Sequence, residues 1–567
     1  MRVISSTSGC FHVIITIIMS KRVVWYVLGI IVIAGGFIRL WQLDSIPSGL
    51  HADEALTGYT AYSLLKTGKD LSGQVKLVGF RDTNIGGTFP SLLSWILVPF
   101  VGAFGLHTYV DRLPSALLGI VSILALFGIV KSLTRDTRIA LIAAFLMSVN
   151  PWAIQISRQG LLESLSLVLV LSGTYYFLTA SRHMWRYALS FALFALSLYS
   201  YDAPRLFLVP FLIVLTIYKW PHIQPIRWSV LKTSFIFWVI FGTVLYRIFA
   251  SGVIHDYERS SVFDPQQIAA TAGGEQLLST APRWLSRLFH NKVTVGYKHV
   301  LTSYVNIFSL DWFFVNGSGN LQRAVGNHGE YHLFELPLFF LGFFYVWTKK
   351  KRLRYLLLSW LLIGPLPGGL SSGSYIYRSV MMLPVPIMFS AYGLGVVLDR
   401  VSRYQGVVKL VTKVGTVVII AVYISSYLFT YFFDYPVYAS EWWSKEQNDA
   451  IRYGVAHQYA YSYVFFDGTL PWVTQYAFLT GLTPAVFHQN TAHTIPVWNL
   501  NGYQFGSLYF VFIPDDVKKL PHAAAFFPKG SLVIVNGNTD VFPKDQPVYT
   551  FQAPDHTHSV YKAVVVR

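Results

Sequence analysis

Long stretches of sequence without a charged side chain limit what this chain can fold into. Residues 23–38, 139–156 and 165–180 contain no Asp, Glu, Lys or Arg. Apolar stretches of about 20 residues have the length that an α-helix needs to cross the hydrocarbon core of a bilayer. Charged residues make up 13% of the chain, whereas soluble domains contain about 25%. The sequence therefore predicts a mainly α-helical, polytopic membrane protein.

The hydropathy pattern predicts about eleven membrane-spanning helices, each roughly as long as the bilayer requires. We expect them at residues 23–42, 113–130, 139–157, 164–180, 187–201, 205–218, 233–250, 333–348, 355–370, 379–398 and 414–433.

The distribution of positive charge favours one orientation of these helices. The six segments expected on the cytoplasmic side, which begin with residues 1–22, hold 20 of the 44 Lys and Arg residues. Their only acidic residues are Asp136 and Asp399. Cytoplasmic loops of membrane proteins carry such an excess of Lys and Arg. The net charge of +17 is therefore interpreted as a consequence of topology, and no nucleic-acid partner is expected.

Three segments outside the membrane are large enough to carry chemistry: the loops 43–112 and 251–332 and the tail 434–567. The tail combines a helix-like run, EWWSKEQNDAIRYGVAHQ, with the β-rich runs YSYVFF, SLYFVFI, GSLVIV and HSVYKAVVV. This pattern predicts a small α/β domain. We expect a cytoplasmic segment at 1–22, a transmembrane domain at 23–433 and an extracytoplasmic α/β domain at 434–567.

An acidic pair, Asp53-Glu54, follows the first apolar stretch in the segment IPSGLHADEALTGYTAYSLLKTGKDLSG, residues 46–73. The pattern predicts a helix over 54–66 with Asp53 as its N-cap. Asp53 is then a cap, a cation ligand or a catalytic base. Neighbouring residues of a helix point about 100° apart, so Asp53 and Glu54 are not expected to act on one atom.

Ala55, Tyr59 and Tyr62 share one face of this predicted helix, because they are four and three residues apart. An apolar face of this kind favours a helix that lies on the membrane surface.

Several arginines are expected at the outer ends of spans or in the first outer loop. A single arginine at such a place is most often an interfacial anchor that reaches the lipid headgroups. Several of them around one carboxylate also form a candidate site for an anionic lipid headgroup. Together with nearby polar residues, the candidates are Arg81, Arg112, Arg158, Arg205, Arg378, Glu163, Asp202, Tyr375 and Tyr377.

Five motifs, spread in order over residues 46–386, resemble the C-type membrane glycosyltransferases, and the resemblance as a whole extends over most of residues 23–433. The resemblance is to glycosyltransferase family 39, the branch of the protein O-mannosyltransferases and aminoarabinose transferases. The first motif is the Asp53-Glu54 segment. The others are FPSLLSWILVPFVGAFGLHTYVDRLPSALLG (89–119), NPWAIQISRQGLLES (150–164), DWFFVNGSGNLQRAVGNHGEYHLFELPLFFLG (311–342) and GPLPGGLSSGSYIYRSVMMLPVP (364–386).

The resemblance implies a C-type glycosyltransferase fold and roles for individual residues. Asp53 matches the catalytic aspartate of the family, Glu54 its neighbour, and Glu163 an acidic residue of the second outer loop. The expected catalytic residues are therefore Asp53, Glu54 and Glu163. Arg112 and Arg378 match recurrent arginines of the family. With the other arginines at outer span ends, the expected ligands of the donor phosphate are Arg112, Arg158, Arg205 and Arg378. The expected substrate contacts are His51, Tyr59, Arg81, Asp202, Tyr375 and Tyr377.

The implied reaction transfers a sugar from a polyprenyl-phosphate donor to a hydroxyl group of a lipid, glycan or protein acceptor on the outer face of the membrane. It proceeds with inversion and uses an aspartate base. No cofactor is required, although Asp53, Glu54, Glu163 and Asp202 offer oxygen ligands for Mg²⁺ or Mn²⁺. The segment TFPSLLSW lacks the His-Pro-Pro form of the eukaryotic mannosyltransferases, which argues against a protein acceptor.

Three other functions are compatible with the composition. A transporter of an anionic substrate has as many spans, but such proteins place ionisable groups or broken helices near the membrane midplane. A ligase or polymerase that acts on a lipid-diphosphate-linked glycan is also compatible. A third alternative is a binding module in which the spans only anchor the tail.

Overall fold

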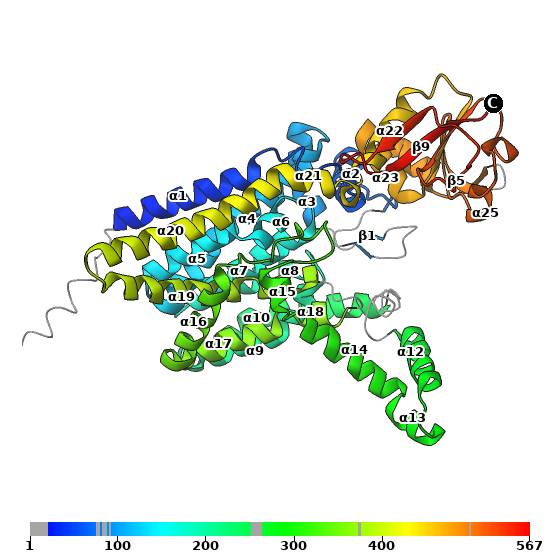
Figure 1. Ribbon diagram of the computed structural model, residues 1–567. Coiled ribbons are helices and arrows are strands. Elements are labelled where there is room, and N and C mark those ends of the chain that lie inside the picture. Colours follow the sequence, from blue (N-terminus) through cyan, green and yellow to red (C-terminus); the bar gives the residue numbers. More distant parts are fainter. Residues whose placement is uncertain are drawn as a thin grey trace, which may run out of the picture.

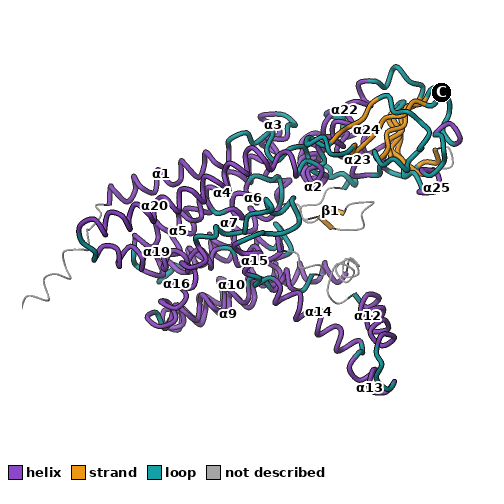
Figure 2. The backbone as a smooth tube through the Cα atoms, in the orientation of Figure 1, coloured by secondary structure: helices purple, strands orange, loops and turns teal. Residues whose placement is uncertain are grey.

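The computed structural model describes residues 21–74, 80–81, 88–89, 92–250, 264–371, 376–497 and 500–567. A bundle of long helices forms most of the molecule, and a small sheet domain built from the C-terminal residues lies at one end of it (Figures 1 and 2). A helical arm projects from the same end of the bundle. The predicted fold class, a helical bundle with a C-terminal α/β domain, is confirmed.

Helices lie at each of the eleven predicted span positions. Six helical segments of the described chain are long and apolar enough to cross a membrane, or seven if one bent pair counts as a span. One of the six, Ala203–Tyr246, joins two predicted spans, and several shorter helices do not reach this length. The exact number of spans therefore remains a prediction. The helices of the bundle are α1 (Lys21–Leu40), α4 (Thr108–Thr134), α5 (Thr137–Val149), α6 (Pro151–Ser157), α7 (Leu162–Thr179), α8 (Met184–Ser197), α9 (Ala203–Ile223), α10 (Arg227–Ala250), α16 (Glu335–Lys349), α17 (Lys351–Ile363), α19 (Pro384–Ser402) and α20 (Gly406–Phe429).

The third predicted span is bent by 57° between α5 and α6. Asn150 and Pro151 cause the break. Proline lacks a backbone N–H and favours the first turn of a new helix, and the Asn150 side chain accepts a hydrogen bond from the N–H of Ala153 at 2.9 Å. The short helix α6 carries the chain to Arg158, at the end of the bundle where the acidic pair lies.

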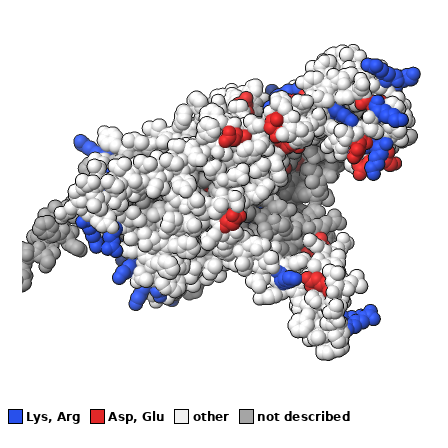
Figure 3. Space-filling view, viewed as in Figure 1, with Lys and Arg blue, Asp and Glu red and all other residues white. Residues whose placement is uncertain are grey.

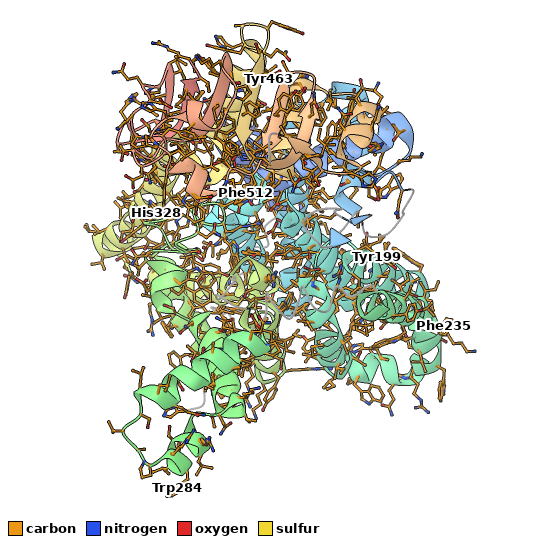
Figure 4. The ribbon with its side chains drawn as sticks, turned by 90° about the vertical axis from the view of Figure 1, so that its right-hand side faces the viewer. Tyr199, Phe235, Trp284, His328, Tyr463 and Phe512 are labelled. Atoms are coloured by element: carbon orange, nitrogen blue, oxygen red, sulfur yellow. The ribbon has the colours of Figure 1, made fainter. Side chains whose placement is uncertain are left out.

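The surface charges agree with the predicted sidedness of the bundle. Lys and Arg gather at the end of the bundle far from the C-terminal domain, and the sides of the bundle are almost free of charge in the view of Figure 3. Phe235, on α10, points outward from the bundle (Figure 4) and is 66% exposed. The chain is a multi-pass membrane protein, and the placement of the C-terminal domain outside the cytoplasm remains a prediction.

The C-terminal domain is built around a seven-stranded mixed sheet with the order β4-β5-β6-β3-β7-β9-β8. The central strand β3 is parallel to β6 and β7, and the other pairs are antiparallel. The predicted helix and the four β-rich runs correspond to α22, β3, β6, β7 and β9. The elements are α22 (Lys445–Ala456), β3 (Tyr463–Asp467), α23 (Leu470–Thr480), α24 (Pro484–Thr491), β4 (Ile495–Val497), β5 (Leu500–Phe505), β6 (Leu508–Val511), α25 (Asp515–Lys518), β7 (Ser531–Asn536), β8 (Tyr549–Gln552) and β9 (Ser559–Val565).

Both faces of the central strands are buried. In β7, Leu532 and Ile534 join one hydrophobic core with α22 and α23, while Val533 and Val535 join a second core on the other face. Successive side chains of a strand point to opposite faces of the sheet. Continuous apolar runs such as GSLVIV are therefore typical of a sheet that is covered on both sides.

Helix α2 (Ala52–Thr67) joins the bundle to this domain. Ala55 and Tyr59 are fully buried in the core that contains α23 and the sheet. The Tyr59 hydroxyl donates a hydrogen bond to the carbonyl of Leu482 at 2.8 Å. The prediction that this face lies on the membrane surface is therefore wrong, because the C-terminal domain covers it. The predicted substrate contact by Tyr59 is corrected too, since its ring and hydroxyl are used in packing.

Two glycines allow a close approach between α16 and α19. A Cβ atom added to Gly342 on α16 would overlap the backbone of Phe389 on α19, and one added to Gly393 on α19 would overlap the backbone of Leu338. Small residues let transmembrane helices approach closely. The pairing of α16 with α19 thus depends on these two positions.

We expect the substitution Gly393→Ala to lower the stability of the protein by about 1–3 kcal/mol, the usual cost of overpacking, because the added methyl group forces α16 and α19 apart. The matched control is Gly415→Ala on α20, where nothing lies within 4 Å of the new Cβ. Thermal unfolding of the detergent-purified variants measures both effects. Equal melting temperatures for the two variants would contradict this account of the packing.

Candidate active site

The N-terminus of α2 places the two acids of the Asp53-Glu54 pair in different surroundings. The N-cap is His51, whose Nδ1 accepts a hydrogen bond from the Asp53 N–H at 3.1 Å. The Glu54 carboxylate completes a capping box by accepting from the His51 N–H at 3.2 Å. The prediction of Asp53 as the N-cap is therefore wrong by two residues. The Asp53 side chain is free of capping and 45% exposed.

Glu54 is fully buried and forms a bidentate ion pair with Arg112. Arg112 donates from Nε and Nη2 to the two carboxylate oxygens, each at 2.8 Å, and the Gly160 N–H donates to Oε1 at 2.9 Å. Burial alone would raise the pKa of Glu54, but Arg112 and the Gly160 N–H outweigh it and hold this pKa below the ordinary value of 4.5. Glu54 is therefore an anion that fixes structure, and it is not available as a base.

Arg112 is also fully buried, and its remaining donors bind backbone carbonyls. Nη1 donates to Leu43 and Pro47 at 3.2 and 2.8 Å, and Nη2 donates to Gly49 at 2.7 Å. A guanidinium group has five N–H donors, and these bonds together with the two to Glu54 use all of them. The predicted contact between Arg112 and the donor phosphate is therefore corrected: Arg112 shapes the loop in front of α2.

Arg158 has a comparable structural task. It is fully buried, and its Nη atoms donate to the carbonyls of Ile38, Trp41 and Ile46 at 2.6, 2.7 and 2.9 Å. Its guanidinium lies over the rings of Tyr431 and Phe432. The predicted phosphate contact of Arg158 is corrected as well, because these bonds bind the end of α1 and the following turn.

A second carboxylate, Glu163 at the start of α7, is buried and paired with Arg323. The Arg323 guanidinium lies 4.5 Å from the centre of the Tyr377 ring. Burial lowers the pKa of Arg323, but the charges of Glu163, Tyr201 and Asp53, in this order, act against burial and raise it. Asp53 thus belongs to the same electrostatic cluster as the Glu163–Arg323 pair.

Tyr201 and Arg378 complete this cluster. The Tyr201 hydroxyl is buried and has no hydrogen-bond partner among the described residues. Glu163, Arg323 and Arg378 all lie within electrostatic reach of this hydroxyl. Arg378 donates to the Ser371 hydroxyl at 2.7 Å. We define the site cluster as His51, Asp53, Glu163, Tyr201, Arg323, Tyr377 and Arg378.

The other predicted site residues have different partners or lie outside the described residues. Asp202 and Arg205, at the start of α9, form an ion pair with each other at 2.5 Å, and Arg205 also donates to the Leu198 carbonyl. Their expected substrate and phosphate contacts remain predictions. Arg81 lies in the short strand β1 (Phe80–Arg81), which pairs with β2 (Thr88–Phe89), and its side chain is outside the described residues. Tyr375 lies outside them entirely.

The carboxylates predicted as ligands of a divalent cation do not form one donor set. Glu54 and Glu163 are each paired with an arginine, and Asp202 is paired with Arg205. No group of three or more His, Cys, Asp or Glu side chains converges on one point among the residues with described placement. A hard cation needs several convergent oxygens. These four carboxylates therefore do not form a site for such a cation in the described part of the chain.

Sequence reasoning missed two members of the site cluster. Arg323 lies within the quoted motif of residues 311–342, but the surrounding glycines and polar residues give no helical or strand period that would show its direction. Tyr201 precedes Asp202 at the outer end of a predicted span, where aromatic residues usually form an interfacial belt. Arg323 and Tyr201 are recognised as members of one cluster only in the folded structure, where Arg323 pairs with Glu163 at the start of α7.

We expect Glu54 and Arg112 to be strongly coupled in a double-mutant cycle. Removing either partner leaves a buried charge unpaired, so Glu54→Ala or Arg112→Ala should each cost about 3–5 kcal/mol of stability. The double variant should cost clearly less than the sum of the two, as thermal unfolding in detergent would measure. The exposed pair Lys445–Asp449, with N and O atoms 2.7 Å apart, is the control and should show a coupling of about 0.2–1 kcal/mol. Additive costs at Glu54 and Arg112 would contradict the ion pair.

The Glu54 pair also predicts a pH dependence of stability. Because the pKa of Glu54 is held below 4.5 in the folded protein, its stabilising effect is complete above this value and is lost as the pH falls through the folded pKa. The melting temperature of Glu54→Gln should therefore lie below that of the wild type at neutral pH, and the gap should shrink in acid below about pH 4. A gap that is the same at all pH values would contradict an ionised Glu54.

Sequence comparisons match parts of the chain. Residues 89–247 match the family described as dolichyl-phosphate-mannose-protein mannosyltransferase. A stretch of 85 residues is 34% identical to YycA of Bacillus subtilis (strain 168), which is named as a candidate mannosyltransferase. This stretch covers 15% of the present chain and 12% of YycA, so it spans only a small part of that relative.

Structure comparisons match nearly the whole chain. ArnT from Cupriavidus metallidurans, bound to undecaprenyl phosphate, aligns with 96% of this chain and 98% of its own, at 11% identity and a TM-score of 0.51. The oligosaccharyltransferase AglB from Archaeoglobus fulgidus, in complex with an inhibitory peptide and a dolichol-phosphate, aligns with 92% of this chain and 70% of its own. That pair has 13% identity and a TM-score of 0.51. The likeness at these identities establishes the fold.

The chain therefore has the fold of the C-type membrane glycosyltransferases and matches, over residues 89–247, the protein mannosyltransferase family, as its motifs predict.

Proposed function

We propose that this chain transfers a sugar from a polyprenyl-phosphate donor to a hydroxyl group of an acceptor, with inversion and with Asp53 as the base. One observation carries the proposal. Asp53 is a half-exposed carboxylate at the edge of a cluster of arginines and tyrosines. The two other carboxylates expected to be catalytic, Glu54 and Glu163, are buried and paired with arginines.

Asp53 has the surroundings that a general base requires. A base must keep its charge and remain within reach of the hydroxyl group from which it takes a proton. The Asp53 carboxylate lies 3.7 Å from His51 Nδ1, and this atom already accepts the Asp53 N–H. Burial lowers the pKa of His51 despite the opposing charges of Asp53 and Glu54. His51 is therefore neutral near pH 7 and does not neutralise the Asp53 charge.

The proposed step balances in atoms and charge. Asp53 takes the proton of the acceptor hydroxyl while the hydroxyl oxygen forms a bond to the anomeric carbon of the sugar. The bond from this carbon to the phosphate oxygen breaks, and the phosphate leaves with the electron pair. Attack from the face opposite to the leaving group inverts the anomeric configuration. The phosphate is a stable anion and needs no acid, but it benefits from positive charge where negative charge develops.

Arg378 is our proposed phosphate ligand among the residues of the site cluster. Its Nη1 donates to a neutral hydroxyl, that of Ser371. The forked geometry of a guanidinium suits a phosphate group. Arg323 lies in the same cluster, but its charge is shared with Glu163. We therefore assign Arg323 the task of holding Glu163 and Tyr377 in place beside the donor.

The arrangement of the molecule supports a reaction between a lipid donor and an acceptor from the water. The site cluster draws on the start of α2, the start of α7 and the residues just before α9, and α2 packs against the C-terminal domain. A donor can therefore enter from the bilayer while the acceptor comes from the aqueous side. ArnT has been seen with undecaprenyl phosphate and AglB with a dolichol-phosphate, which supports a polyprenyl-phosphate donor here. The positive charge at the opposite end favours an extracytoplasmic site.

We expect Asp53→Asn to lower the rate of sugar transfer by about 10²–10⁴-fold, the usual contribution of a general base, because the amide cannot accept the proton. The measurement is transfer of radiolabelled sugar in membranes that contain the full chain. The donors are a panel of polyprenyl-phosphate sugars with lipid-diphosphate sugars beside them. Asp516→Asn, an exposed position of α25, is the matched control and should retain full activity.

Two further results decide between the alternatives. Full activity in Asp53→Asn would contradict the assignment of the base, provided that the wild type consumes a monophosphate donor. Consumption of diphosphate donors alone would favour the ligase or polymerase. If a chelator abolishes transfer and Mg²⁺ or Mn²⁺ restores it, a divalent cation takes part in the reaction.

A further inference from the structure

Three helices form an arm that leaves the bundle next to α18 (Leu366–Gly369) and is not used by the proposed reaction. The arm consists of α12 (Pro265–Leu278), α13 (Arg283–Phe289) and α14 (Lys292–Asn306). It reaches sideways beyond the helices of the bundle, at the end that carries the C-terminal domain (Figure 1). Figure 4, turned by 90°, shows the same projection with Trp284 at its far tip.

The arm is a folded unit with its own small core. Ile268 and Ala272 of α12 pack with Val295 of α14. Glu275 accepts hydrogen bonds from His290 and Lys298, each at 2.9 Å. At its base, the Tyr304 hydroxyl donates to the carbonyl of Leu362 at 2.7 Å. The exposed faces of the arm are therefore set by a defined fold.

Large apolar side chains cover the outer faces of this folded arm. On α14, Val293 and Tyr297 are 80% and 68% exposed, and Leu301 and Val305 continue the same stripe at intervals of four residues. Residues spaced by four lie on one face of a helix. At the tip, Trp284 is 70% exposed, and four more exposed apolar residues lie close to it in sequence: Leu277, Leu278, Leu288 and Phe289. A contiguous apolar surface of this kind marks an interaction site in a soluble environment or a contact with lipid.

Positive charge accompanies this apolar surface. Residues 276–306 contain no Asp or Glu but four cations, Arg283, Arg287, Lys292 and Lys298. Lys298 is paired with Glu275. Arg283 and Arg287 are one helical turn apart and immediately precede Trp284 and Leu288, so cations and apolar groups occupy adjacent stripes of α13.

We propose that the arm is a lipid-binding element that inserts its apolar face into the membrane interface and binds anionic phospholipid headgroups through Arg283, Arg287 and Lys292. The bundle crosses the bilayer, so lipid surrounds it at the level from which the arm projects sideways. Aromatic residues suit the boundary between water and hydrocarbon. An amphipathic helix with cations on its polar side binds anionic membranes through buried apolar area and electrostatic attraction. The positive charge of the arm therefore favours an anionic lipid surface over a protein partner.

The test uses the full chain in lipid nanodiscs. Cys10 is the only cysteine, so a Cys10→Ser background allows a fluorescent label at Leu288→Cys or Tyr297→Cys. The control label is at Tyr459→Cys, which is 93% exposed on the C-terminal domain. Quenching by nitroxides attached to lipid acyl chains is compared with quenching by aqueous iodide. Discs of phosphatidylcholine alone are compared with discs that also contain phosphatidylglycerol.

We expect lipid-attached nitroxides to quench both arm labels several-fold more than the control label, and iodide to show the reverse order. Phosphatidylglycerol should increase the lipid quenching, and high salt should cancel this increase because it screens the headgroup attraction. The triple variant Arg283→Gln, Arg287→Gln, Lys292→Gln should lose the increase. The matched double change Arg283→Lys, Arg287→Lys, which retains Lys292, should keep it. The melting temperatures of the variants show that the arm and bundle remain folded.

Three results would overturn the proposal. Arm labels that respond to both quenchers as Tyr459→Cys does would show that the arm stays in water. Lipid quenching that is the same with and without phosphatidylglycerol would exclude headgroup selection. Labels protected from both quenchers, together with crosslinks between the arms of two molecules, would show that a second copy of this chain covers the apolar face instead.

Discussion

The buried ion pair between Glu54 and Arg112 determines where the proposed base lies. Arg112 binds the Glu54 carboxylate with two donors and the loop in front of α2 with its other three. Removing two charges from water is costly unless they are paired and fully hydrogen-bonded, and here every guanidinium donor has an acceptor. Glu54 and Asp53 are neighbours on a helix and point about 100° apart. Fixing Glu54 inward therefore turns Asp53 outward, toward the Glu163–Arg323 pair.

Buried arginines donate hydrogen bonds to backbone carbonyls near the ends of several helices. Arg39 donates to the carbonyls of Gly35, Ser148 and Met147, and Arg158 binds the carbonyls after α1. The last carbonyls of a helix lack partners within the helix, and lipid offers none. These arginines supply the missing donors. A sequence does not distinguish them from arginines that face a substrate, because Arg112, Arg158 and Arg378 all occur at outer span ends. The carbonyls that surround Arg112 and Arg158 become apparent only in the folded structure.

The sequence predicts the fold better than the site because the two depend on different information. Spans follow from composition, and the strands of the C-terminal domain follow from short apolar runs such as YSYVFF and GSLVIV. The N-cap of α2 was misplaced because Asp53 is the stronger capping residue by type, while the structure uses the His51 ring and the Glu54 carboxylate. Tyr59 was misplaced because an apolar helix face looks alike whether lipid or another domain covers it. The position of Arg323 could not be predicted because this residue lies in a long loop whose sequence has no helical or strand periodicity.

The contacts of Leu50 indicate that the C-terminal domain helps to position the proposed base. Its N–H donates to the Asn448 side chain of α22 at 2.7 Å, and its carbonyl accepts from Gln475 of α23 at 2.8 Å. Trp443 packs over the Arg112 guanidinium. Leu50 lies three residues before Asp53, so the domain holds the loop from one side while Arg112 holds it from the other. A tail that merely recruited partners to an anchor would not need these bonds. The position of Asp53 is thus a joint property of the bundle, α2 and the sheet domain.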